Sequence, residues 1–198
     1  MRAFVFFTIS ILLIIGCAKE QNINIDSKNR ANKPFETYSD SNFKSKAIAY
    51  INSIRQKGAP CAPFAPPLRL NSHLEAAANA HAKDMAINNF LKHTGSGTIV
   101  DIAKPSNGVG SLFFERIIFF GYPVKPKQLT GENITYTKIK VVGTKDEFTH
   151  FKRAVNNLIA DPPHCVIFMN PRFQDVGIGL FKTDKRYYWV LDFAEAKK

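Results

Sequence analysis

The chain has 198 residues, and its 27 Lys and Arg against 16 Asp and Glu give a net charge of +11. Such a charge is usual for nucleic-acid-binding proteins, but here the lysines are scattered and are not interleaved with aromatic residues in one stripe. We therefore predict a basic, solvated surface and no nucleic-acid partner. Roughly 155 residues from Ser41 onwards are enough for one domain with its own core.

The first 16 residues have the pattern of a secretory signal. Arg2 precedes an uncharged, apolar run over residues 3–15, which is too short for an ordinary membrane span. The sequence Ile14-Ile15-Gly16-Cys17 resembles the lipobox of bacterial lipoproteins, in which the cysteine is acylated and becomes the first residue. We expect residues 1–16 to be a lipoprotein signal peptide and Cys17 to be a lipid anchor. A cleaved signal with an unmodified Cys17 is the alternative.

The segment that follows is polar and has no regular period. It is rich in Asn, Lys, Ser and Asp, with few isolated apolar residues, so it cannot bury a core. We predict a lipidated flexible tether over residues 17–41 and a single domain over residues 42–198.

Three segments of the domain have apolar residues at helical spacing: 42–57, 72–89 and 144–160. The second and third begin with the capping-box sequences Ser72-His73-Leu74-Glu75 and Thr144-Lys145-Asp146-Glu147. Pro162 and Pro163 end the third helix, which places Asp161 at its end. The apolar segment 112–120 is predicted to be a short buried helix, with the wall of an apolar pocket as the alternative.

The remaining regular segments read as strands. Gly131-Glu132-Asn133 opens a strand that continues to Tyr136. Residues 174–181 and 186–193 form two further strands around a turn at residues 183–185, which predicts a hairpin. Gly177 and Gly179 within it indicate crowding on one face of the sheet.

Seven segments occur in an order and at spacings that are typical of one family. They are Pro67–Asn71 with Leu74, Ala77 and Ala78; His81, Asp84 and Met85; Phe90 with His93-Thr94-Gly95; Arg116 with Gly121-Tyr122; Gly131–Ile134; residues 161–179; and Tyr188-Trp189-Val190 with Phe193. Together they resemble the CAP superfamily, the cysteine-rich secretory, antigen 5 and pathogenesis-related-1 proteins, and its bacterial secreted lipoprotein branch most closely. The resemblance implies an α+β fold, a three-layer α-β-α sandwich with an open cleft.

The resemblance also implies a set of cleft residues. Relatives line the cleft with two histidines and two acidic residues, which match His93, Glu132 and His164 in this chain, with Asp161 at the second acidic position. Leu158 stands where relatives have tryptophan. Some relatives bind a divalent metal at the histidines, so His93 and His164 are the expected metal ligands. We expect weak zinc binding and no required cofactor.

Two cysteines remain in the domain if Cys17 carries lipid. Cys61 and Cys165 match a cysteine pair of the bacterial branch, and a disulfide is the expected use of two cysteines in an exported chain. It would close a loop of about a hundred residues and contribute roughly 4 to 5 kcal/mol in the chain-entropy model. Cys165 as a nucleophile activated by a histidine is the alternative.

These observations favour a binding module with no established catalysis over an enzyme. We expect a monomer that is lipid-anchored to the outside of a bacterial membrane, at the outer membrane or cell surface, with a metal ion, a lipid or a host protein as its ligand. A hydrolase assisted by a metal or by a histidine–glutamate pair is one alternative, and lipid or sterol binding is another. His81 lies on an apolar helix face and is expected to be a core histidine. A purely structural role for the polar quartet also fits, because buried polar groups must be paired in any case.

Overall fold

The computed structural model describes residues 41–103, 109–144 and 146–196. The predicted signal peptide, Cys17 and the tether up to residue 40 lie outside the described residues. Within the described ranges, no helix is long and apolar enough to cross a membrane.

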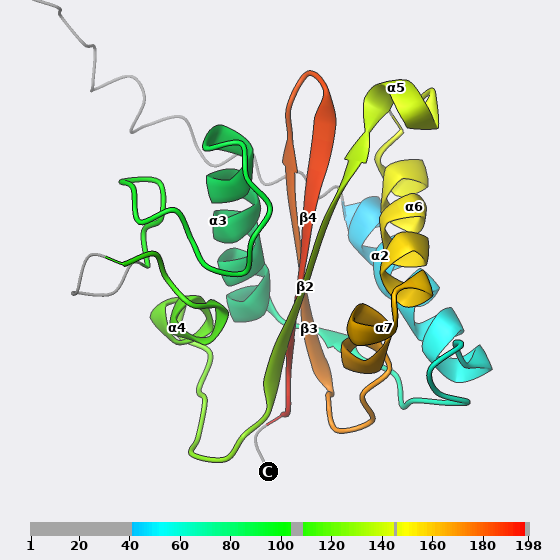
Figure 1. The fold of residues 1–198 in the computed structure, drawn as a ribbon. Coiled ribbons are helices and arrows are strands. Elements are labelled where there is room, and N and C mark those ends of the chain that lie inside the picture. The colour runs from blue at the N-terminus through cyan, green and yellow to red at the C-terminus, as the bar shows by residue number, and fades with distance from the viewer. Residues whose placement is uncertain (1–40, 104–108, 145, 197–198) are drawn as a thin grey trace, which may run out of the picture. The chain divides into compact units, whose positions relative to one another are not determined.

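A four-stranded sheet in the order β1-β3-β4-β2 forms the middle of the domain (Figure 1). Its strands are β1 (Arg69–Leu70), β2 (Thr130–Lys138), β3 (Asp175–Lys182) and β4 (Arg186–Ala194). β4 is antiparallel to both β3 and β2, whereas the short β1 is parallel to β3. The predicted hairpin is therefore the centre of the sheet, and β2 is an edge strand.

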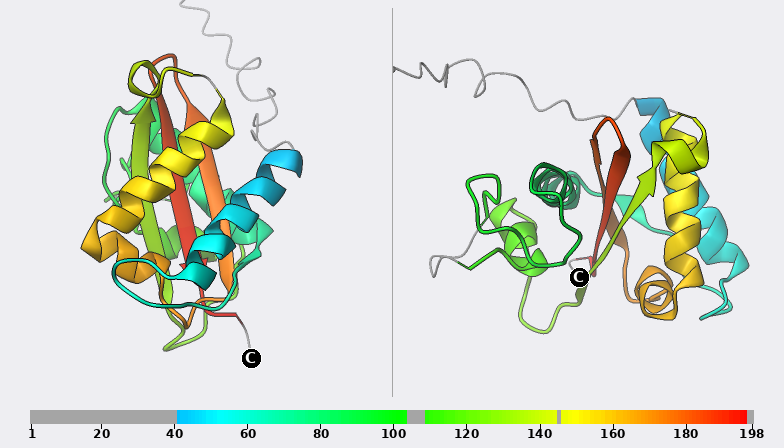
Figure 2. Two further views of the ribbon diagram at one scale, coloured as in Figure 1. Left: turned by 90° about the vertical axis from the view of Figure 1, so that its right-hand side faces the viewer. Right: turned by 45° about the horizontal axis from the view of Figure 1, so that its top comes forward.

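Helices cover both faces of this sheet, which confirms the α+β sandwich (Figures 1 and 2). α3 (Ser72–Ile87) and α4 (Phe113–Phe119) lie on one face. α2 (Ser41–Lys57), α6 (Glu147–Ala160) and α7 (Pro162–Phe168) lie on the other, and the short α5 (Ile139–Val142) follows β2 directly.

The side chains of β4 alternate between the two cores. Trp189, Leu191 and Phe193 belong to the cluster that includes residues of α2, α6 and α7. Tyr188 and Val190 belong to a cluster with residues of α3. Because successive side chains of a strand point to opposite faces, Asp192 lies on the α3 side. The carboxyl group of Asp192 thus lies next to the apolar side chains that β4 packs against α3.

The glycines of β3 bring α3 close to the sheet. A Cβ added at Gly177 would overlap the backbone of Leu74, and one at Gly179 would overlap the backbone of Ala78. This confirms the predicted crowding.

The predicted disulfide between Cys61 and Cys165 is present, with an S–S distance of 2.03 Å and a Cα–Cα distance of 6.0 Å. It joins the irregular segment after α2 to α7. The buried Arg55 holds the end of α7 as well, since it donates to the carbonyl oxygens of Phe168 and Asn170. Burial lowers the pKa of Arg55 to about 10, so its guanidinium remains charged at neutral pH.

Local details differ from the sequence-based expectations at three helix ends. Asn71, and not Ser72, caps α3, because its side-chain oxygen accepts from the amides of His73 and Leu74. Asp146, and not Thr144, caps α6 by accepting from the amide of Thr149.

The third difference is at the two prolines that the sequence predicts to end a helix. Pro162 and Pro163 begin the additional helix α7 directly after α6. The first turn of a helix tolerates proline because its amides have no partner within the helix. Asp161 therefore lies between two helices.

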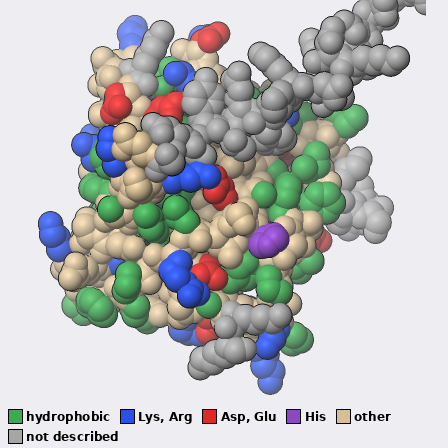
Figure 3. Space-filling model, turned by 180° about the vertical axis from the view of Figure 1, so that it is seen from behind, with side chains coloured by type: hydrophobic (Ala, Val, Ile, Leu, Met, Phe, Trp, Pro, Cys, Tyr) green, Lys and Arg blue, Asp and Glu red, His purple; other side chains and the backbone are tan. Residues whose placement is uncertain are grey.

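α4 is less buried than predicted. Only Arg116 and Ile117 of this helix are buried, whereas Ile118 is 53% and Phe119 is 58% exposed. Lys and Arg side chains are scattered over the face of the domain shown in Figure 3 and are not gathered in one stripe.

Candidate functional site

His93 and Glu132 form the first half of the site. The Nδ1 atom of His93 lies 2.8 Å from Oε1 of Glu132, and a carboxylate can only accept, so Nδ1 carries the proton. The His93 side chain is 50% exposed, whereas that of Glu132 is 1% exposed. Glu132 thus fixes the orientation of the imidazole. Because Nδ1 carries the proton of the neutral ring, Nε2 has none.

Arg116 of α4 neutralises Glu132. Its Nη2 donates to Oε2 of Glu132 at 2.7 Å and to the carbonyl oxygen of His93 at 2.8 Å. Burial alone would raise the pKa of Glu132, but the hydrogen bond from His93 and the charge of Arg116 lower it below its usual value. Glu132 is therefore an ionised, buried carboxylate that orients His93.

A second carboxyl group lies beside Glu132. Asp192 of β4 is the direct cross-strand partner of Glu132, it is fully buried, and neither of its oxygens accepts a hydrogen bond within the described residues. Burial first, and then the charge of Glu132, raise the pKa of Asp192 well above its usual value. Burial next to the ionised Glu132 thus favours the protonated form of the Asp192 carboxyl group.

Two aspartates shape the loop that carries His93. Asp84 of α3 accepts from the amide of Ser96 at 2.8 Å, and Asp101 accepts from the amides of Gly97 and Ser111 at 3.1 and 2.8 Å. Gly95 has to be glycine, because a Cβ there would overlap the Asp101 carboxylate. The loop is tied to α3 on one side and, through Ser111, to Arg116 on the other.

Asp161 and His164 form the second half of the site. The Nδ1 atom of His164 is hydrogen-bonded to Oδ2 of Asp161, one helical turn away. This pair is more open than the first, with the side chains of His164 and Asp161 30% and 51% exposed. His164 again turns Nδ1 to a carboxylate, so Nε2 is its available nitrogen.

The edge strand β2 lies between the two pairs. Glu132 points to the α3 side of the sheet, and its neighbour Asn133 points to the α7 side. There Asn133 donates through Nδ2 to the carbonyl oxygen of His164 at 3.0 Å. The four predicted residues therefore form two separate hydrogen-bonded pairs, and consecutive residues of β2 contact His93 and the backbone of His164.

In the part of the chain that the structure describes, the donor set does not form a dedicated metal site. Each histidine has the carboxylate partner that metal-binding histidines usually have, which fixes the ring and leaves Nε2 as a ligand. Among the described residues, however, no three His, Cys, Asp or Glu side chains are grouped so that they could hold a metal ion. A closed zinc site normally has four protein ligands and a catalytic one three.

His81 is buried and lies near this site. Its Nε2 contacts the carbonyl oxygen of Lys92 at 2.8 Å, and its buried Nδ1 has no partner within the described residues. Burial lowers the pKa of His81, although the charge of Glu132 acts in the opposite direction. His81 is thus a neutral core histidine that supports the chain just before His93.

Arg116 and Asp192 are the functional neighbours that sequence reasoning did not include. Arg116 is one of the residues that carry the family resemblance, which gives it no role, and the sequence predicts Asp192 only as a residue of a strand. The sequence signal for both is a charged residue within an otherwise apolar strand or helix. Such a residue is almost never buried without a charged partner, so it indicates a buried pair.

Solved structures of two bacterial proteins have the same fold. One is an extracellular protein of Bacillus anthracis str. Ames that contains an SCP domain, with a TM-score of 0.56 and 19% identity over 79% of this chain and 41% of that chain. The other is an outer surface protein of Borrelia burgdorferi, with a TM-score of 0.56 and 20% identity over 80% of this chain and 97% of that chain. At this level of identity the likeness shows the fold.

Family membership comes from the sequence itself. No protein of curated function matches the chain significantly. The model of the cysteine-rich secretory protein family, CAP, matches residues 48–193, which include all of the sheet except Ala194, both histidine–carboxylate pairs and the disulfide. The chain therefore belongs to the CAP family of cysteine-rich secretory proteins.

Proposed function

We propose that this CAP protein is an extracytoplasmic binding module whose ligand is held by the Nε2 atoms of His93 and His164. The observation that supports this most is that both imidazoles have the same kind of hydrogen-bond partner. Each directs Nδ1 to a carboxylate, Glu132 or Asp161. A ring held in this way presents a fixed lone pair at Nε2.

The electrostatics favour binding over catalysis. Glu132 is buried and already engaged by His93 and Arg116, so it is not free to take a proton from a substrate. A divalent metal such as zinc is the simplest ligand for two imidazoles, with water or a partner molecule completing its coordination. Binding of this kind is weak and not required for folding.

The proposed location is outside the cytoplasm, with Cys17 as a lipid anchor in a bacterial membrane. The secretory family, the disulfide and the two relatives, which are described as an extracellular and an outer surface protein, support the location. The lipobox-like sequence supports the anchor. Mass spectrometry of the native protein tests it, and an unmodified Cys17 would remove the anchor from the proposal. We propose that the domain acts as a monomer.

Isothermal titration calorimetry with zinc tests the proposed site. Wild type should bind one zinc ion weakly, and both His93→Ala and His164→Ala should lose the binding heat. Affinity should fall as the pH falls, because a protonated imidazole cannot ligate.

A matched control is available in His73→Ala. His73 is also an exposed histidine, but its Nδ1 contacts the carbonyl oxygen of Phe120, away from both pairs. Equal zinc binding by wild type, His93→Ala and His164→Ala would disprove the two-histidine site, whereas loss in His73→Ala alone would place the metal elsewhere.

Lipid contact is a second candidate function, which the exposure of α4 favours. Phe114, Ile118 and Phe119 project 39%, 53% and 58% exposed side chains from one short helix. Phe119→Ser should reduce binding of a fluorescent fatty acid without changing zinc binding. Unchanged fatty-acid binding would remove this candidate.

A further inference from the structure

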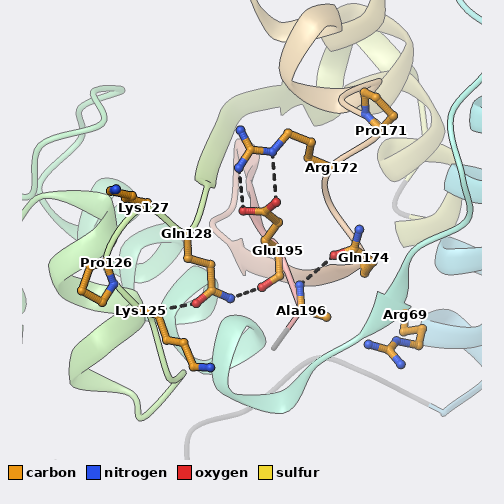
Figure 4. A pocket seen from close by; sticks show the side chains of 10 residues that line it. All are labelled: Arg69, Lys125, Pro126, Lys127, Gln128, Pro171, Arg172, Gln174, Glu195 and Ala196. Atoms are coloured by element: carbon orange, nitrogen blue, oxygen red, sulfur yellow. Dashed lines mark hydrogen bonds and ion pairs between the residues drawn. The ribbon is translucent and has the colours of Figure 1, made fainter. Parts of the chain in front are cut away.

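A pocket of about 830 Å³ lies at the end of the sheet where β2 and β3 begin and β4 ends (Figure 4). It is unrelated to the two histidine pairs, none of whose residues lines it. Its walls come from two connections, from the segment after β4 and from β1: Arg69, Lys125, Pro126, Lys127, Gln128, Pro171, Arg172, Gln174, Glu195 and Ala196.

The pocket is strongly basic. Its lining has four cations, Arg69, Lys125, Lys127 and Arg172, and one acid, Glu195. Neither lysine ammonium group has a partner within the described residues. The pocket therefore has an uncompensated positive charge that an anion can neutralise.

Glu195 is already held by the protein and does not compete with a ligand. Arg172 donates to it through Nε and Nη2 at 3.0 and 2.9 Å (Figure 4). The amide of Leu129 also donates to it, at 2.8 Å. The same arrangement fixes the plane of the Arg172 guanidinium.

Arg69 is oriented in a similar way. Its Nε and Nη2 both donate to Oδ1 of Asp175, at 3.2 and 3.0 Å, while its side chain stays 70% exposed. Both arginines thus have a fixed guanidinium plane, and each still has an Nη1 group to donate. A fixed guanidinium with remaining donors suits a phosphate group.

Lys127 has a backbone conformation that lysine rarely adopts. The amide of Gln128 donates to the carbonyl oxygen of Lys125 at 3.0 Å, Pro126 is the second residue of this turn, and Lys127 has φ of 68°. These features identify a type II turn, in which the third residue is usually glycine. A non-glycine residue at positive φ is a local strain that is often found at ligand sites. Here the strained residue brings a positive charge to the pocket wall.

We propose that this pocket binds a phosphate group. The charges of Lys125 and Lys127, which no carboxylate of the described residues compensates, favour a multiply charged oxyanion over a monocarboxylate, and the oriented arginines match the geometry of phosphate oxygens. The phosphate belongs either to a soluble phosphorylated ligand or to a lipid headgroup. This phosphate site is separate from the proposed site at the histidine pairs, and it lies on the basic surface of the protein.

Lys127→Gly separates this role from a structural one. Glycine adopts the positive φ without strain, so the melting temperature should stay the same or rise by about 2 °C. Affinity for inorganic phosphate should nevertheless fall about fivefold, as expected for the loss of one charge near the ligand. The measurement is an NMR titration of the full domain with inorganic phosphate, followed at the amides of Lys127, Gln128 and Arg172.

Lys185→Ala is the matched control, because Lys185 is an exposed turn lysine between β3 and β4 and does not line the pocket. It should leave the phosphate affinity unchanged. Non-saturable shifts in wild type, or equal affinities for wild type and Lys127→Gly, would overturn the proposal. An equal loss in Lys185→Ala would also overturn it, since it would indicate unspecific attraction to the basic surface.

Vesicle sedimentation distinguishes the two sources of phosphate. If the protein sediments with phosphatidylglycerol vesicles but not with phosphatidylcholine vesicles, and Lys127→Gly reduces this sedimentation, the ligand is a lipid headgroup. Phosphate binding that depends on Lys127, together with vesicle binding that does not, would assign a soluble ligand. Both results support the pocket.

Discussion

Glu132 connects the residues of the candidate site. One of its oxygens accepts from His93 and the other from Arg116, while Asp192 lies directly across from it in the sheet. Because Glu132 holds the imidazole of His93, we expect a substitution of Arg116 or Asp192 to change the orientation of His93. The pair Asp161–His164 has no such support, since both side chains are partly exposed.

Asp192 makes the free energy of unfolding depend on pH, and the raised pKa of its carboxyl group gives the sign of this dependence. Its pKa in the folded state is raised above the unfolded value of about 3.9. Between these two pKa values the folded protein holds a proton that the unfolded chain has released, so the free energy of unfolding falls as the pH rises. The groups that set this balance are Asp192 itself, Glu132 of β2, Arg116 of α4 and, through its interaction with Glu132, His81 of α3.

Asp192→Asn removes this proton and keeps the shape of the side chain. Its stability relative to wild type should therefore increase with pH above about pH 4, by up to about 1.4 kcal/mol per pH unit. Glu132 has a lowered pKa, which stabilises the fold above its unfolded pKa and is lost as the pH falls. Urea denaturation of both proteins over a pH series measures the difference. Parallel stability curves would show that Asp192 is ionised in the folded protein.

The packing of α3 on β3 depends on the space that Gly179 leaves. Gly179→Ala should cost about 1 to 3 kcal/mol, because the added methyl group overlaps the backbone of Ala78 and α3 has to move. Gly143→Ala is a useful comparison, since Gly143 has φ of 75° but nothing within 4 Å of an added Cβ.

Both substitutions should destabilise the domain, for different reasons. Gly143→Ala acts through backbone strain alone, whereas Gly179→Ala should also shift the amide NMR signals of α3. Unchanged α3 signals in Gly179→Ala would contradict the close packing seen in the structure.

The longer elements were predictable because each has a local signal. α2, α3 and α6 have apolar residues at helical spacing, and the hairpin of β3 and β4 has turn residues between two apolar runs. α7 was missed because Pro162 and Pro163 indicate a helix end as readily as a helix start. The two-residue β1 has no local signal at all, since its pairing with β3 is a long-range contact.

The site was predictable only as far as the family resemblance reached. The pairing of His93 with Glu132 joins residues 39 positions apart, and Asp192 meets Glu132 through strand register. Spacing along a sequence does not determine register between strands that are far apart. The roles of Arg116 and Asp192 therefore required the structure.

At the scale of the whole molecule, the disulfide links residues 104 positions apart. Replacing Cys61 and Cys165 together by serine should lower the free energy of unfolding by about 2 to 5 kcal/mol, because the unfolded chain regains its freedom. It should also loosen α7 and so weaken zinc binding at His164. Urea denaturation of the double variant measures the first effect, with reduced wild type as its control. Equal stability of oxidised and reduced wild type would contradict the predicted contribution.

The most direct test of the two-histidine site is the protonation pattern of its imidazoles. Long-range proton–nitrogen NMR spectra at mildly alkaline pH should show His93 and His164 both protonated at Nδ1, and zinc should shift the Nε2 signals of these two histidines but not those of His73. Protonation at Nε2 in either histidine, or Nε2 signals that do not respond to zinc, would contradict the proposed binding site.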